Sequence, residues 1–187
     1  MKKKSFAKYF QALVCLLFAL QCHAAHCAVV PEEVSPQITI PAPESPQVQK
    51  YLGLMEMGPF ALSKVNAKIV IIEFFNALCP HCHANAPIVN KLYKVIQDDA
   101  DLRDVKVIGI AVGNDKSQVD AFRKYFKVPF PLFIDENFAI SATMGVVDTP
   151  TTMVLATSNG EVFASHIGVI KDFEGVLKEL RTIHKKL

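Results

Sequence analysis

The chain has 187 residues, of which 51% are hydrophobic and 20% are charged, and its formal net charge is +2. This balance excludes a strongly basic protein and indicates neither a nucleic-acid partner nor an anionic surface. After two N-terminal segments, roughly 135 residues remain, enough for one well-packed domain.

Residues 1–28 have the pattern of a secretory signal peptide. Lysines stand at positions 2, 3, 4 and 8, nine apolar residues occupy 12–20, and small residues follow at Ala24, Ala25 and Ala28. The apolar run is shorter than the roughly 20 residues that span a bilayer. We therefore expect export, a periplasmic location and cleavage after Ala28, with an uncleaved N-terminal anchor as the alternative. Loss of the four lysines would change the net charge to −2.

The positions of the cysteines support a working thiol pair. Three of the five cysteines, at positions 15, 22 and 27, lie in the signal segment. Cleavage after Ala28 leaves Cys79 and Cys82, which is too few for a disulfide framework. In an exported domain, such a pair indicates chemistry rather than scaffolding.

Residues 29–48 contain five prolines, at positions 31, 36, 41, 43 and 46. We predict a stiff, extended linker without a core of its own, and a disordered N-terminus of the mature chain is the alternative. The folded domain is then 49–187.

Strand and helix patterns alternate through this domain. The run 69–75 is apolar apart from Glu73, as expected of a strand covered on both faces, and Val119, Phe122 and Phe126 share one helix face. Strands are expected at 69–75, 105–112, 130–134, 152–156 and 161–168, and helices at 80–98, 117–126, 138–144 and 173–184. A βαβ start followed by a hairpin and a final helix predicts a thioredoxin-like α/β sandwich, with a mixed central sheet flanked by helices.

The segment Cys79-Pro80-His81-Cys82 follows the first strand and opens the first long helix. Residues at i and i+3 lie on the same side of a helix, so the two thiols can form a disulfide. Cys79, at the helix N-terminus, is predicted to be the exposed attacking thiol, with its thiolate favoured by free N–H groups. Pro80 suits the first helical position, and His81 adds donor capacity or positive charge. Cys82 is the inner, resolving thiol.

The stretch 73–82 resembles the active-site segment of DsbA-type oxidases, which share the CPHC sequence. Glu73 matches the buried acid of the thioredoxin superfamily, and Pro87 matches its helix-kinking proline. The stretch 145–152 resembles the cis-proline loop of that superfamily. Pro150 follows Cys79 by 71 residues, a spacing similar to that of TlpA/ResA-like periplasmic proteins.

The resemblance implies roles for three further residues. A carboxylate in an apolar strand is costly, so Glu73 is expected to have a raised pKa and to accept the proton of Cys82; a solvent-facing position is the alternative. A cis bond at Pro150 would expose the Thr149 backbone beside Cys79 for pairing with an extended substrate. Exported protein thiols and disulfides would be the substrates, a membrane redox protein the partner, and neither cofactor nor metal is required.

The direction of electron flow is left open by the sequence. TlpA/ResA-like reductases often carry glutamate three residues after the second cysteine, where this chain has Asn85. The Pro-His dipeptide favours an oxidase or isomerase, because a stabilised Cys79 thiolate stabilises the reduced form. The spacing of the motifs instead favours a reductase.

Three other functions compete with this interpretation. With His83, the segment reads CxxCH, the pattern for covalent haem c attachment. Two thiolates and a histidine could also hold copper or zinc in a metal chaperone. A peroxiredoxin-like peroxidase shares the fold, but its Pxx(T/S)xxC signature is absent, since Glu73 and Asn76 occupy the first two specified positions.

Overall fold

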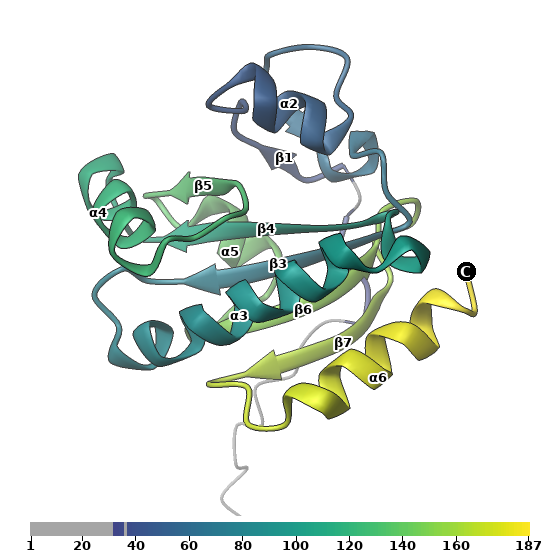
Figure 1. Cartoon of the computed structure of the whole chain (residues 1–187). Coiled ribbons are helices and arrows are strands. Elements are labelled where there is room, and N and C mark those ends of the chain that lie inside the picture. The colour runs from purple at the N-terminus through teal and green to yellow at the C-terminus, as the bar shows by residue number, and fades with distance from the viewer. Residues whose placement is uncertain (1–31, 36) are drawn as a thin grey trace, which may run out of the picture.

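The computed structural model describes residues 32–35 and 37–187 (Figure 1). The expected signal peptide and its cleavage site after Ala28 lie outside the described residues. Among the residues that are described, no helix is long and apolar enough to cross a membrane.

A five-stranded mixed sheet forms the centre of the molecule, with the strand order β5-β4-β3-β6-β7. Strand β3 runs parallel to β4, and β4 parallel to β5, whereas β6 is antiparallel to both β3 and β7. All residues of β3 and β6 are buried, which accounts for their mainly apolar sequences; Glu73 in β3 and Thr151 and Thr152 in β6 are the polar exceptions. The strands are β3 (Ile69–Phe75), β4 (Val105–Val112), β5 (Leu132–Asp135), β6 (Thr151–Ala156) and β7 (Val162–Ile167).

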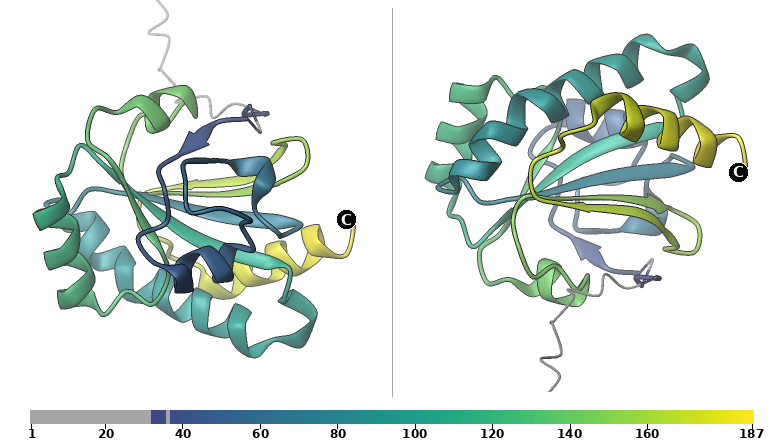
Figure 2. Two further views of the ribbon diagram at one scale, coloured as in Figure 1. Left: turned by 90° about the horizontal axis from the view of Figure 1, so that it is seen from above. Right: turned by 90° about the horizontal axis from the view of Figure 1, so that it is seen from below.

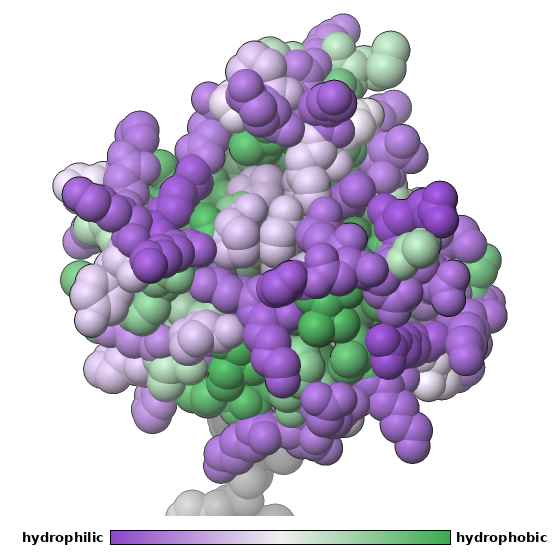
Figure 3. Space-filling model, in the orientation of Figure 1, coloured by the Kyte–Doolittle hydropathy of each residue, from purple (hydrophilic) through white to green (hydrophobic). Residues whose placement is uncertain are grey.

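Three helices cover one face of this sheet: α3 (Pro80–Asp98), α4 (Lys116–Phe126) and α6 (Phe173–His184) (Figure 2). Their apolar sides pack on Ile69, Ile71 and Phe75, the apolar β3 side chains that point to this face. The outer surface of these helices is mainly hydrophilic, with a few apolar patches between them (Figure 3). The predicted α/β sandwich is therefore confirmed.

The opposite face of the sheet is covered by chain from the predicted linker. The segment forms β1 (Thr39–Ile40), which pairs with β2 (Phe60–Ala61), and leads into α2 (Pro46–Leu52). Two short 3-10 helices, η1 (Leu62–Lys64) and η2 (Ala100–Leu102), and α5 (Ala139–Thr143) complete the elements.

The linker prediction for 29–48 differs from the structure from Val34 onward. Val34 and Ile38 are buried, and Ile40 is fully buried, in a cluster with the β3 side chains that point away from α3. Ser45 caps α2 by accepting a hydrogen bond from the Val48 N–H. The prolines separate short apolar segments. These segments pack on the face of the sheet that α3, α4 and α6 do not cover.

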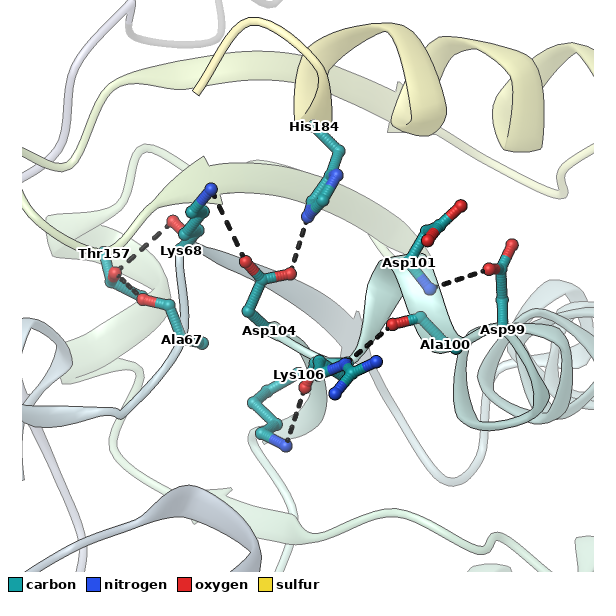
Figure 4. A network of polar contacts seen from close by, with 10 residues as sticks. Ala67, Lys68, Asp99, Ala100, Asp101, Asp104, Lys106, Thr157 and His184 are labelled. Carbon is teal, nitrogen blue, oxygen red and sulfur yellow. Dashed lines mark hydrogen bonds and ion pairs between the residues drawn. The ribbon is translucent and has the colours of Figure 1, made fainter.

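The end of the sheet where β3 and β4 begin is held by a polar network (Figure 4). His184, at the end of α6, donates from Nε2 to Asp104 Oδ1 at 2.6 Å, and Lys68 Nζ lies 3.7 Å from Asp104 Oδ2. The Thr157 hydroxyl donates to the Ala67 carbonyl, which joins the end of β6 to the start of β3. These contacts fix α6 against the sheet at the end opposite to Cys79.

Candidate active site

Cys79 and Cys82 lie where β3 passes into α3. Cys79 occupies the N-cap position, Pro80 is the first helical residue, and Cys82 lies in the first turn. Cys79 is half-buried, whereas Cys82 is only 1% exposed, and both are free thiols. The structure thus places one accessible thiol in front of one buried thiol, as the sequence predicts.

Two asparagines hold the loop between β3 and Cys79. Asn76 donates from its side chain to the Val112 carbonyl at 2.8 Å and accepts from the Leu78 N–H at 2.9 Å. Asn114 Oδ1 accepts from the Ala77 N–H at 2.8 Å. The sequence analysis did not predict this role. The available signal was an asparagine just after each of two strands, since asparagine side chains often bond to the backbone of turns.

The surroundings of the two thiols drive their pKa values apart. Burial by itself would raise the pKa of Cys79, but the Cys82 N–H and thiol and the His81 N–H lower it to a value below its usual range. Burial raises the pKa of Cys82 to about 12, although the Asn76 N–H, 3.4 Å from its sulfur, acts in the opposite direction. Cys79 is therefore the thiol that ionises. His81 contributes through its backbone, while its side chain is exposed.

The loop before β6 completes the surroundings of Cys79. The Thr149–Pro150 peptide bond is cis, which confirms that prediction. The Cys79 thiol donates to the Thr149 carbonyl at 3.4 Å, and the Thr149 N–H donates to Asp148 Oδ1 at 2.8 Å. The backbone of Thr149 therefore lies beside the Cys79 sulfur.

A hollow of about 350 Å³ lies between Cys79, the Thr149 loop and α5. Phe138 and Val147 line it and are 55% and 72% exposed. The hollow therefore lies directly beside Cys79.

Glu73 lies behind Cys82 on the face of the sheet that α3 covers. It is 5% exposed on the central strand, so the solvent-facing alternative is excluded. Glu73 Oε1 accepts from Asn85 Nδ2 at 2.9 Å, and Oε2 lies 2.5 Å from Thr152 Oγ1. Burial raises the pKa of Glu73 to about 7, while both hydrogen bonds act in the opposite direction.

A small cavity of about 10 Å³ connects the acid with the inner thiol. Glu73 and Cys82 line it together with apolar side chains, including Phe75, Ala86 and Val89. A group with a pKa near neutral thus shares an apolar space with a thiol that must lose its proton to react. The sequence did not indicate Asn85 or Thr152 as partners of Glu73.

The CxxCH pattern is not arranged for haem attachment. Cys82 is buried inside the first turn of α3, and His83 donates from Nε2 to the Ala77 carbonyl at 2.7 Å. The His83 ring lies 5.1 Å from that of Phe126, between centroids. Within residues 32–35 and 37–187, no three His, Cys, Asp or Glu side chains are grouped to hold a metal ion.

The chain matches the AhpC/TSA family over residues 41–170 and belongs to it. It is similar to proteins named thiol-disulfide oxidoreductase ResA. It is 29% identical to the one of Geobacillus thermodenitrificans over 111 residues, 59% of this chain and 61% of that protein. It is 25% identical to the one of Halalkalibacterium halodurans over 129 residues, 66% of this chain and 70% of that protein. The matched region thus spans less than two thirds of the first of these relatives.

Solved structures agree on the fold. A Chlorobium tepidum structure described as the thiol:disulfide interchange protein DsbE superposes with a TM-score of 0.65 at 17% identity, covering 83% of this chain and 99% of that one. A secreted disulfide oxidoreductase of Mycobacterium tuberculosis superposes with a TM-score of 0.58 at 18% identity, covering 79% and 96%. At such identities, the likeness shows the thioredoxin-like fold alone.

Proposed function

We propose that this protein is a thiol–disulfide oxidoreductase that exchanges a Cys79–Cys82 disulfide with protein thiols. The observation that carries the proposal is the pairing of a half-exposed Cys79, whose pKa is lowered, with a buried Cys82, whose pKa is raised to about 12. This arrangement gives one nucleophile and one resolving thiol. The relatives named thiol-disulfide oxidoreductase support it.

The reaction proceeds in two exchanges. The Cys79 thiolate attacks a substrate disulfide, forms a mixed disulfide and releases one substrate thiolate. Cys82 then passes its proton to the Glu73 carboxylate and attacks the Cys79 sulfur. This step closes the Cys79–Cys82 disulfide and releases the second substrate thiolate. Two electrons have moved to the substrate, and the reverse sequence oxidises a substrate dithiol.

The substrate polypeptide lies in the hollow beside Cys79 and pairs with the backbone of Thr149. Because the Thr149 N–H donates to Asp148 in this structure, a substrate carbonyl would replace the Asp148 carboxylate as its acceptor. The exposed Phe138 and Val147 would contact apolar side chains around the substrate cysteine. No cofactor takes part.

The same proposal includes location and partner. The basic start and short apolar run of residues 1–28 support export to the periplasm, and one structural neighbour is described as secreted. In an exported protein, the thiol pair must be returned to its starting state by another redox protein, and a membrane protein is the partner that spans both compartments.

Trapping of the mixed disulfide tests the assignment. Cys82→Ala removes the resolving thiol, so Cys79 should accumulate covalent adducts with exported proteins that disappear on reduction. Cys79→Ala, the matched control, should trap none. Adducts in the Cys79 variant alone would contradict the assigned roles, and no adducts in either variant would contradict the function.

The reduction potential decides the direction of exchange. Reference proteins range from about −270 mV for thioredoxin to about −120 mV for DsbA. Equilibration of the protein with glutathione, followed by counting of free thiols, would place it on this scale. A value near the upper end assigns disulfide donation, and a value near the lower end assigns reduction of exported proteins.

A peroxide assay separates this function from that of a peroxidase. Glu73 and Asn76 replace the proline and the threonine or serine of the peroxidase signature, so we expect only slow consumption of peroxide in the presence of a thiol reductant. Rapid turnover of peroxide would contradict the proposal.

A further inference from the structure

Asn85 stands between the buried acid and the loop that precedes α6. Its side chain is fully buried on α3, and its Oδ1 accepts from the Ile170 N–H at 2.9 Å. A backbone N–H can only donate, so this contact fixes which way the amide points. Asn85 Nδ2 therefore faces Glu73 Oε1, at 2.9 Å.

Thr152 contacts the other oxygen of the same carboxyl group. It is fully buried on β6, directly opposite Glu73 in the sheet, and its hydroxyl lies 2.5 Å from Glu73 Oε2. A hydroxyl can donate or accept, whereas the amide nitrogen of Asn85 can only donate. The two oxygens of Glu73 are therefore not equivalent, and only Oε2 faces a group that can accept a hydrogen bond from a protonated carboxyl group.

Few other titratable groups face this carboxyl group. Cys82, on α3, shares the small cavity with Glu73. On the β7 side, His166 is opposite Thr152 in the sheet and donates from Nε2 to Glu179 on α6 at 2.9 Å. On the β4 side, the neighbour of Glu73 is Gly109. Asn85 and Thr152 are thus the groups that contact the two oxygens directly.

We propose that Asn85 and Thr152 are positioning residues that confine the proton exchanged by Glu73 to Oε2. The inference rests on the proposed function and deepens it. When Cys82 loses its proton, Glu73 takes one up on Oε2, and the Thr152 hydroxyl turns from donor to acceptor. Asn85 keeps its hydrogen bond to Oε1 in both states, so the carboxyl group does not rotate. Asn85, which stands where TlpA/ResA-like reductases often have glutamate, thus has the role of holding Glu73 Oε1.

Titration of the Glu73 carboxyl group tests the inference without any assay of activity. In the NMR spectrum of protein labelled with carbon-13 glutamate, each side-chain carboxyl group gives a signal. The signal that disappears in Glu73→Gln belongs to Glu73. Asn85→Leu and Thr152→Val each remove a hydrogen bond that is stronger with the carboxylate than with the neutral acid. We expect each to raise the titration midpoint by about one pH unit, a tenfold change in the ionised fraction at a given pH.

Asn90→Leu is the matched control on the same helix. Asn90 donates to the Phe126 carbonyl at 2.8 Å and is not a hydrogen-bond partner of Glu73. Its replacement should lower the melting temperature without moving the midpoint. The pH profile of the resolving step should shift together with the midpoint in the Asn85 and Thr152 variants, while that of Cys79 alkylation should not.

Unchanged midpoints in both variants would overturn the inference, and a shift in Asn85→Leu alone would overturn the assignment of the proton to Oε2. If Asn85→Leu does not fold, Asn85→Ala removes the same donor with a smaller side chain that has no hydrogen-bonding group. Absence of disulfide exchange in the unmodified protein would refute the proposed function, and the carboxyl titration would still decide this inference.

Discussion

Two carboxyl groups at opposite ends of the central sheet have opposite surroundings. Asp104, before β4, contacts His184 and Lys68 and is partly exposed. Glu73, near the end of β3, is buried and contacts only the neutral groups of Asn85 and Thr152. Burial tends to raise the pKa of both; the contacts with His184 and Lys68 hold that of Asp104 below its usual range, whereas burial of Glu73 takes its pKa to about 7.

The difference separates a stabilising end of the molecule from a reactive end. A carboxylate that stays ionised at neutral pH contributes a constant attraction, which suits the anchoring of α6. A carboxyl group that changes its charge near neutral pH can exchange a proton, which suits the neighbour of Cys82. Substitutions at the two ends should therefore have effects of different kinds.

The largest effect is expected from Cys79→Ser. Loss of the attacking thiol should reduce the rate of disulfide exchange to that of the uncatalysed reaction. Stability should change by less than about 1 kcal/mol, since the half-buried thiol makes one weak hydrogen bond. An insulin-reduction assay and a thermal melt measure the two effects. Retention of catalysed exchange would show that Cys79 is not the attacking thiol.

Glu73→Gln should change how stability depends on pH. Because the pKa of Glu73 is raised from 4.5 to about 7, its contribution is fully present below pH 4.5 and is lost as the pH rises through about 7. The loss corresponds to about 3 kcal/mol. Glutamine cannot ionise, so the variant should gain stability relative to the unmodified protein between pH 5 and pH 8, on the order of the same amount. Urea unfolding at several pH values checks this, and parallel curves for the two proteins would contradict it.

Asp104→Asn should change stability with the opposite dependence on pH. The partly exposed contacts with His184 and Lys68 make a contribution of about 1 kcal/mol. Since the pKa of Asp104 is lowered, this contribution is present above pH 4 and is lost as the pH falls through the lowered value. Unfolding at pH 7 should therefore show a loss that vanishes in acid, with disulfide exchange unchanged. A changed exchange rate would show that the two ends are not separate.

The smallest effect is expected from Lys116→Ala on α4. Its ion pair with Asp120, at 2.6 Å, joins two exposed side chains one helical turn apart. Such pairs contribute about 0.3–0.5 kcal/mol and weaken in salt. Unfolding in low and high salt measures it, and an effect above that of Asp104→Asn would reverse the expected order.

The reactive end was more readily predicted than the cover of the sheet. β3, α3 and α6 have the predicted bounds: a buried apolar run specifies β3, the Cys79–Pro80 step marks the start of α3, and the apolar face of an amphipathic helix specifies α6. β1 and β2 have two residues each, too short to show a period, and the prolines around β1 suggested a linker. Val34, Ile38 and Ile40 are buried because they pack on the β3 side chains that point away from α3.

Within the site, residues close in sequence were predicted and distant partners were not. Cys79, Cys82 and Pro80 lie as expected, because the spacing of a helix relates them. Thr152 is 79 residues from Glu73, so their contact depends on the sheet register, which the sequence does not reveal. Asn85 was noticed only as a departure from the pattern of similar proteins.

The reactivity of the two thiols towards iodoacetamide tests the central claim most directly. The reduced protein would be alkylated briefly at pH values from 4 to 10, and mass spectrometry of its peptides would count modification at each cysteine. A free cysteine thiol has a midpoint of about pH 8.5. We predict that Cys79 reacts with a midpoint below this value and that Cys82 stays unmodified. Preferential reaction of Cys82, or a Cys79 midpoint at or above that of a free thiol, would contradict the account.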